Sequence, residues 1–396
     1  VAEAIADDEH LAVQAGTGTG KSLAYLVPSI AHAVAANEPV VVSTATIALQ
    51  RQLTERDLPR LSKALTEPVG RTPTFAILKG RANYLCLNKL HSGVADEPDR
   101  ELFDAFELSR TGREVTRLRE WSSDTETGDR DDLSPGVSER SWQQVSVSSR
   151  ECVGAAACPY GQDCFAELAR AKAGQADVVV TNHAMLAIDA MSPANILPEH
   201  KVVVIDEAHE LADRITSVST EEVSTTGVSY VTRRAGKLIA TESAETLAAA
   251  SEELEKLLDD ARTGEWLRLP AGAAEVLASL RDRLWEVHTE IGPAGKGDGK
   301  SDPEATATRQ LARAAAESLH DTVVRILTVF GEADVSKRRD VVWLAEDMLK
   351  GGTLRRSLRI APLSVAGLLR TSLFTESTVI LTSATLTIGG DFDALA

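Results

Sequence analysis

The segment AGTGTGKS, residues 15–22, decides how the rest of the sequence is interpreted. It follows a short apolar run, LAVQ (11–14), and precedes a helical pattern that continues to about residue 36. Its glycines allow the backbone to curl, so that N–H groups and the helix start converge on phosphate oxygens. In such a loop Lys21 reaches the β- and γ-phosphates, and the Ser22 hydroxyl binds Mg²⁺. The predicted phosphate-binding loop comprises Ala15, Gly16, Thr17, Gly18, Thr19, Gly20, Lys21 and Ser22.

Two carboxylates follow another apolar run, VVVI (202–205), in the sequence DEAH (206–209). Asp206 is placed to hold Mg²⁺, and Glu207 to orient or deprotonate an attacking water. Taken alone, such a pair is also compatible with a solvated strand end. The ligand sites of open α/β sheets lie at these strand ends, however, and the phosphate loop has the same setting. We therefore predict Lys21, Asp206 and Glu207 as catalytic residues.

A third segment of this kind, TSATL (382–386), ends the apolar run TVIL. Together with the first two segments it is typical of helicase-type motors and not of kinases or small GTPases. We expect His209, Ser383 and Thr385 to sense the bound nucleotide and to transmit its state to a nucleic-acid surface.

Short apolar runs alternate with helical patterns over the first 85 residues, which indicates βαβ units and a parallel sheet. Runs such as VVVI (202–205) lack polar alternation, as expected for strands buried on both faces. The predicted strands are 11–16, 39–46, 74–78, 177–182, 201–208 and 378–385.

Two stretches interrupt this pattern. Residues 86–164 hold all four cysteines and an aperiodic acidic segment (122–136) that we predict to be a loop, whereas residues 210–345 are helical in pattern. Three apolar stripes with helical spacing are predicted to be packing surfaces. They comprise Leu247, Leu254 and Leu258; Val276, Leu280, Leu284 and Val287; and Leu311, Ala315, Leu319, Ile326 and Phe330.

The composition is that of a globular protein, with 43% hydrophobic residues among 396. No apolar run is long enough to span a bilayer and no signal peptide is visible, so we expect a cytoplasmic protein without membrane contact. The net charge of −17 argues against nucleic acid as a partner. Residues 45–90 nevertheless carry a net +5, and residues 348–375 carry five basic residues and no acid. Each stretch is either a nucleic-acid contact or a solvated face.

The cysteine spacing is Cys86-x65-Cys152-x5-Cys158-x5-Cys164, which is too sparse for a disulfide framework. It also lacks the C-x2-C pairs of zinc ribbons and ferredoxins. Spacing alone leaves three alternatives open: a zinc site, an iron–sulfur cluster, or buried cysteines without a ligand.

The sequence resembles the superfamily 2 iron–sulfur DNA helicases, in particular the DinG-like branch related to XPD. The resemblance extends over essentially the whole chain, with its motifs in the family's order. It is carried by AGTGTGKSLAYLVP (15–28), STATIALQRQL (43–53), KGRANYLC (79–86), the cluster Cys152, Cys158 and Cys164, ADVVVTNHAML (176–186), VIDEAH (204–209) and LTSATL (381–386).

This resemblance implies a RecA-like α/β motor domain with a parallel sheet, interrupted by an inserted iron–sulfur domain and an inserted helical arch domain. It implies that Cys86, Cys152, Cys158 and Cys164 bind a [4Fe–4S] cluster, alongside ATP with Mg²⁺ held by Ser22 and Asp206. The implied parts are motor segments 1–85, 165–209 and 346–396, a cluster domain at 86–164 and an arch domain at 210–345.

The implied activity is ATP hydrolysis coupled to 5′→3′ DNA unwinding in repair or replication. Single-stranded and tailed duplex DNA would be the substrates, with RNA–DNA hybrids as a further substrate and a monomer as the working form. Arg51 and Arg56 lie where a single-strand track would run, and Tyr84 is either a base-stacking residue or a core aromatic beside the cluster. Two other readings remain open: a nucleic-acid-binding module in which nucleotide and cluster are structural, and an RNA-preferring motor.

Three departures from the family pattern affect these expectations. Gln14 stands where the family has glutamate. The family's glutamine-bearing segment before the phosphate loop is missing, and no second motor domain with its arginine follows TSATL. We therefore expect this chain to be the N-terminal part of a longer protein that by itself does not unwind DNA.

Overall fold

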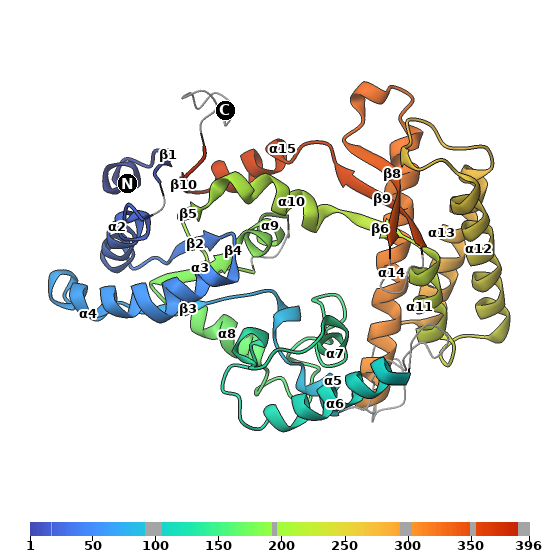
Figure 1. Cartoon of the computed structure of the whole chain (residues 1–396), viewed down its shortest axis with the longest axis horizontal. Coiled ribbons are helices and arrows are strands. Elements are labelled where there is room, and N and C mark those ends of the chain that lie inside the picture. The colour runs from blue at the N-terminus through green and yellow to red at the C-terminus, as the bar shows by residue number, and fades with distance from the viewer. Residues whose placement is uncertain (17, 92–104, 192–195, 294–302, 349–353, 387–396) are drawn as a thin grey trace. The chain divides into compact units, whose positions relative to one another are not determined.

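The computed structural model describes residues 1–16, 18–91, 105–191, 196–293, 303–348 and 354–386. The chain forms two compact units (Figure 1). Unit 1 comprises Val1–Gly80, Ala166–Val218 and Ser364–Ala396, and unit 2 comprises Arg81–Phe165 and Ser219–Leu363. Unit 1 is thus assembled from three stretches of chain that two long insertions separate.

Unit 1 is built on a six-stranded sheet with the strand order β1-β10-β5-β2-β4-β3, in which every pair is parallel. Each of the six predicted apolar runs forms one of these strands, so the predicted parallel α/β sheet is confirmed. The strands are β1 Leu11–Gln14, β2 Val40–Thr44, β3 Phe75–Ile77, β4 Val178–Asn182, β5 Val202–Asp206 and β10 Thr378–Ser383.

Helices cover both faces of this sheet, because successive side chains of a strand point to opposite sides. Val40 and Val42 of β2 pack in one core with α2 (Lys21–Ala36). Val41, between them, packs in a second core with α9 (His183–Met191) and α10 (Leu211–Ser219). All three valines have 0% exposure, which explains the apolar run without alternation.

The other helical segments of unit 1 are short, apart from α4. The predicted helix after β2 is interrupted by one π-helical segment, η1. These segments are α1 Ala2–Ala6, α3 Ile47–Arg51, η1 Gln52–Asp57, α4 Leu58–Val69, α8 Phe165–Ala173 (which begins in unit 2), η4 Ala208–Glu210, α15 Ala366–Leu369 and η6 Arg370–Phe374.

The first part of unit 2 carries the cysteines and has its own small core around Leu85, Leu118 and Trp142. The Trp142 indole N–H donates to Ala82 O at 2.7 Å, so this buried ring has a polar partner. The acidic segment 122–136 is irregular as predicted, apart from one short turn. The helical segments are η2 Arg81–Asn83, α5 Leu87–His91, α6 Ala105–Trp121, η3 Arg130–Asp132 and α7 Glu139–Gln143.

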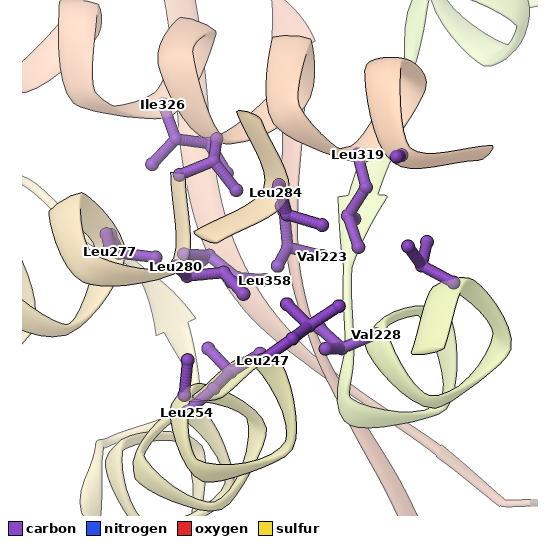
Figure 2. Close-up of a cluster of buried hydrophobic side chains, with 14 of the residues drawn as sticks. Val223, Val228, Leu247, Leu254, Leu277, Leu280, Leu284, Leu319, Ile326 and Leu358 are labelled. Atoms are coloured by element: carbon purple, nitrogen blue, oxygen red, sulfur yellow. The ribbon is translucent and has the colours of Figure 1, made fainter. Parts of the chain in front are cut away.

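The second part of unit 2 packs four long helices and a short sheet around the largest core (Figure 2). The three predicted apolar stripes lie in or against buried surface, which confirms them as packing surfaces. Leu247 and Leu254, Leu280 and Leu284, and Ile326 contribute from three different helices. The helices are α11 Thr225–Ala235, α12 Thr241–Asp260, α13 Ala273–Ile291 and α14 Pro303–Gly331.

An antiparallel sheet in unit 2 was not predicted. Its strand order is β6-β9-β8-β7, with β6 Glu221–Val223, β7 Gly264–Glu265, β8 Asp340–Met348 and β9 Leu354–Pro362. The prediction of a helical 210–345 is therefore incomplete, because β6, β7 and the start of β8 fall within it. The predicted motor segment 346–396 is divided between the units, because β9 lies in unit 2 and unit 1 resumes at Ser364. The short η5 (Val335–Lys337) precedes β8.

Within the described ranges, no helix has both the length and the apolar composition needed to cross a membrane.

A cavity at the centre of the unit 2 core should be costly. Leu254 is fully buried, and we expect Leu254→Ala to lower the free energy of unfolding of unit 2 by about 2–5 kcal/mol. Leu267 has 53% exposure and serves as the control, for which we expect a change within about 0.5 kcal/mol. Urea denaturation of both variants measures the difference. Equal effects at the two sites would contradict this assignment of the core.

A buried histidine ties α9 to the parallel sheet of unit 1. His183 has 1% exposure, and its Nδ1 lies 2.7 Å from Ser43 Oγ at the end of β2. Burial lowers the pKa of His183 to about 4, because a protonated imidazole would lose its hydration there. In the unfolded chain the same group titrates near its ordinary value of about 6.5.

This difference predicts how stability depends on pH. As the pH falls from about 6.5 towards 4, the unfolded chain binds a proton at residue 183 that the folded chain does not bind. The free energy of unfolding should therefore decrease, by roughly 3 kcal/mol at most from this group. His183→Asn should remove that part of the pH dependence, whereas His32→Asn on α2 should retain it. Urea denaturation between pH 4 and 7 tests this, and an unchanged slope in His183→Asn would refute it.

Candidate nucleotide site and cysteine pocket

The predicted phosphate loop lies between β1 and the amino end of α2. Ala15 N donates to Ser383 O at 2.9 Å, which places the start of the loop beside β10. Gly18 and Gly20 have φ angles of 77° and 89°, in the left-handed region that favours glycine. Gly20 is the N-cap of α2 and has no side chain to cap it, so an anion suits the first amides of the helix.

The turn is also held from within, since Thr19 Oγ1 donates to Gly16 O at 2.8 Å. Of the eight residues predicted for the loop, seven are described and lie in this turn. Thr17 lies outside the described residues.

The predicted catalytic lysine and glutamate are in direct contact. Lys21 Nζ lies 2.7 Å from Glu207 Oε1, and the side chains have only 11% and 19% exposure. Burial raises the pKa of Glu207, but the Lys21 ammonium more than offsets this, so the pKa lies below its ordinary value. Glu207 has a φ of 55°, unusual for a residue other than glycine. The glutamate is thus held ionised against the phosphate-loop lysine.

Asp206 ends β5 with 3% exposure, and its hydrogen-bond partner is not evident from the sequence. Tyr25 donates its phenolic O–H to Asp206 Oδ2 at 3.1 Å. Burial raises the pKa of Asp206 above its ordinary value, although the Tyr25 hydrogen bond and the Lys21 charge act in the opposite direction. The sequence contains one indication that Tyr25 lies near this site. Tyr25 is three residues after Ser22 and hence on the same face of the helix.

The predicted coupling residues adjoin this pair. Ser383 Oγ donates to Glu207 Oε2 at 3.2 Å, and His209 Nδ1 lies 2.7 Å from the same hydroxyl. Thr385 contributes its backbone, because its N–H donates to Ser383 Oγ at 3.2 Å. The structure therefore brings together Lys21, Glu207, Ser383 and His209 from three separate stretches of chain.

Gln14, the departure from the family pattern, has a defined position in this site. Its side-chain Oε1 accepts a hydrogen bond from Leu386 N at 2.8 Å. The residue that precedes the phosphate loop thus holds the TSATL turn through an amide oxygen, an acceptor that a glutamate would also supply.

The four cysteines are free thiols of intermediate burial in unit 2. Cys86, Cys152 and Cys158 line one cavity, together with Ala307 and Leu311 of α14. Burial raises the pKa of the Cys86 thiol to about 11, and mutual repulsion with the other three cysteines adds to it. Cys164 Sγ lies 3.9 Å from Arg81 Nη1.

A buried cation adjoins these thiols. Lys89 has 6% exposure, lines the same cavity, and donates from Nζ to the carbonyl oxygens of Gln143 (2.6 Å) and Ser146 (3.1 Å). Within the described residues, no group of three or more His, Cys, Asp or Glu side chains has the geometry of a metal-ion site. Four thiols without a disulfide, beside two cations, are chemically suited to an anionic thiolate cluster.

Several basic residues of the two stretches pair with acids, which the sequence did not indicate. In the stretch 348–375, Arg355 and Arg359 pair with Glu222 and Asp347, and Arg356 pairs with Glu346. In the stretch 45–90, Arg56 pairs with Asp57, Arg71 pairs with Asp177, and Lys89 is buried. The interpretation of 348–375 as a basic nucleic-acid contact is therefore not supported by these three arginines.

Tyr84 has 3% exposure and packs as a core aromatic, so its ring is not open for base stacking. Of the two readings offered for this residue, the structure favours the core.

The comparisons with known proteins agree with this geometry. The DEAD/DEAH box helicase family model matches residues 1–92, and the DEAD_2 family model matches residues 143–228. The ATP-dependent helicase DinG of Mycobacterium tuberculosis H37Rv is 51% identical over 402 residues, covering 100% of this chain and 59% of that protein. The ATP-dependent DNA helicase YoaA of Escherichia coli K12 is 35% identical over 293 residues, covering 72% of this chain and 42% of that protein.

A solved XPD helicase is similar over 97% of this chain and 56% of its own, at 16% identity and a TM-score of 0.47. The chain spans about three-fifths of the length of the mycobacterial relative. Because half of the residues are identical to those of DinG along the whole of this chain, and a helicase family model matches residues 1–92, the chain belongs to the DinG-like helicases.

Proposed function

We propose that this chain is the nucleotide-hydrolysing motor part of an ATP-dependent DNA helicase. The supporting observation is the contact of Lys21 with Glu207, which in turn contacts Ser383. It joins the phosphate-loop cation, the acid that follows β5 and the segment that follows β10 in one hydrogen-bonded group. The relatives named above are ATP-dependent helicases, and YoaA is named as a DNA helicase.

In the proposed mechanism, the loop amides and Lys21 bind the phosphates of ATP, with Ser22 and Asp206 holding Mg²⁺. Mg²⁺ would neutralise charge on the β- and γ-phosphates. Lys21 exchanges its carboxylate partner for the γ-phosphate, which releases Glu207 from the ion pair. Glu207, whose pKa lies below its ordinary value, then accepts a hydrogen bond from the attacking water and orients it.

Coupling to movement would begin at Ser383. Its hydroxyl contacts both Glu207 and His209, so a change in the position of Glu207 alters a hydrogen bond on β10. Residues Ser383, His209 and Thr385 are thus placed to report the nucleotide state to the rest of the motor.

We further propose that unit 1 is the first motor domain, with 86–164 as the cluster domain and 210–345 as the arch domain. The substrates would be single-stranded and tailed duplex DNA, unwound 5′→3′ by a monomer in repair or replication, in the cytoplasm. RNA–DNA hybrids would be a further substrate.

The four cysteines would hold a [4Fe–4S] cluster. Support comes from the cavity that three of them share and from the cations Arg81 and Lys89 beside them. Those cations would offset the negative charge of a thiolate-bound cluster. The cluster would supply a rigid link between Cys86 and the segment 152–164.

Removal of the loop cation tests the nucleotide site. We expect Lys21→Ala in the full-length protein to reduce DNA-stimulated ATP hydrolysis by at least a hundredfold, because the buried ammonium that would contact the γ-phosphate is lost. Lys201→Ala, an exposed lysine paired with Glu38, is the control and should retain the wild-type rate.

The assay is phosphate release with and without single-stranded DNA, followed by strand separation on a 5′-tailed duplex. Hydrolysis by Lys21→Ala within a few-fold of wild type would exclude the proposed site. DNA binding without DNA-stimulated hydrolysis in the wild-type protein would favour a nucleic-acid-binding module. A preference for RNA tails over DNA tails of equal length would favour an RNA motor.

Loss of one thiol tests the cluster. We expect Cys152→Ser, and separately Cys158→Ser, to lose the iron and the unwinding activity while retaining nucleotide binding, because these cysteines lie in unit 2 and the phosphate loop lies in unit 1. Iron content and the visible absorption spectrum of anaerobically purified protein are the measurements. Wild-type iron content in both variants would rule out the four-cysteine ligand set.

A further inference from the structure

Tyr25 contributes one polar atom to an otherwise apolar part of unit 1. Its side chain has 2% exposure and packs with Leu26, Ile30 and Val204 in the core on the α2 side of the sheet. A phenylalanine would fill that volume equally well. The hydroxyl is the exception, because it contacts Asp206, one of the two residues that we propose as Mg²⁺ ligands.

The hydroxyl makes one hydrogen bond to another element. It donates to Asp206 Oδ2 at 3.1 Å. Ser22 and Tyr25 both lie on α2, whereas Asp206 ends β5. The phenol therefore connects the helix that follows the phosphate loop to the strand that carries the acidic pair.

The orientation of the Asp206 carboxylate is fixed from both sides. Oδ1 accepts a hydrogen bond from Glu207 N at 3.1 Å, while Oδ2 accepts from Tyr25. Of these two contacts, only the one with Tyr25 links the carboxylate to another element. Removal of the hydroxyl would therefore leave Oδ2 without this link to α2.

We infer that Tyr25 is a positioning residue for Mg²⁺: its hydroxyl holds the Asp206 carboxylate in one orientation before the metal arrives. This inference rests on the proposed nucleotide site. Mg²⁺ demands near-octahedral geometry and gives up its water reluctantly, so small errors in ligand position weaken its binding. Partners of metal ligands commonly change metal affinity by 10–100-fold when removed.

Tyr25→Phe removes the hydroxyl alone and keeps the ring in its core. In the full-length protein, we expect the Mg²⁺ concentration for half-maximal binding of a fluorescent, non-hydrolysable ATP analogue to rise by about tenfold. Binding of the analogue in EDTA should be unchanged, because the loop amides and Lys21 remain. ATP hydrolysis should fall at low Mg²⁺ and recover as Mg²⁺ is raised. Tyr230→Phe in unit 2 removes a hydroxyl elsewhere and should behave as wild type.

The outcomes separate this inference from the proposed function. A wild-type protein that does not bind the analogue refutes the nucleotide site itself. A wild-type protein that binds it, with an unchanged Mg²⁺ requirement in Tyr25→Phe, refutes the role of Tyr25 alone. An equal loss of binding with and without EDTA would show a merely structural role and would also refute it.

Two further measurements keep the test decisive. In an Asp206→Asn background, Tyr25→Phe should cause little additional change in the Mg²⁺ requirement, because the group on which it acts is already altered; a full additional effect would contradict the inference.

In wild-type protein labelled with 3-fluorotyrosine, addition of Mg²⁺ to the analogue-bound state should shift a tyrosine ¹⁹F resonance. The absence of any such shift would overturn the inference even if Tyr25→Phe failed to fold.

Discussion

The pairing of β10 with β1 on one side and β5 on the other is the constraint on which the candidate site depends. Its parallel register sets Ser383 opposite Gln14 and Thr382 opposite Asp206. Because all three strands run in the same direction, their carboxyl ends open at one edge of the sheet. The phosphate loop, the acidic pair and the TSATL segment are neighbours for this reason, although up to 369 positions separate Gln14 from Ser383 in the sequence. A slip of one residue would turn every inward side chain of β10 outward and separate these groups.

Much of unit 1 could be predicted from the sequence because its signals are local. A run such as VVVI (202–205) is apolar throughout, and a glycine-rich turn between a strand and a helix has few structural meanings. The prediction thus identified the strands and the residues at their ends, including Lys21, Glu207 and Ser383. It did not identify Tyr25, whose significance depends on Asp206 lying opposite it. The chemistry of a single residue can be inferred from the sequence. A hydrogen bond between distant elements can be predicted only when the strand order is known.

In unit 2 as well, local patterns could be predicted from the sequence, whereas pairing between distant segments could not. The apolar stripes of α12, α13 and α14 have a helical period and were predicted, since each is a property of one segment. The β6-β9-β8-β7 sheet was not predicted, and its edge strand β6 pairs residues such as Glu222 and Arg359 that lie more than 130 positions apart. The pairing of charged residues could not be predicted for the same reason. Arg355, Arg356 and Arg359 look like a free basic stretch in the sequence, but strand pairing sets them against acids.

The central place of β10 also determines when the protein is able to fold during its synthesis. β1 pairs only with β10 among the described strands, and β10 lies near the end of this chain. At about 5–20 residues per second, tens of seconds pass between synthesis of the phosphate loop and synthesis of its partner strand. Both long insertions emerge in that interval, and each has its own core to collapse around. Until β10 is synthesised, the sheet has a gap between β1 and β5, so the candidate nucleotide site cannot be complete before that strand is in place.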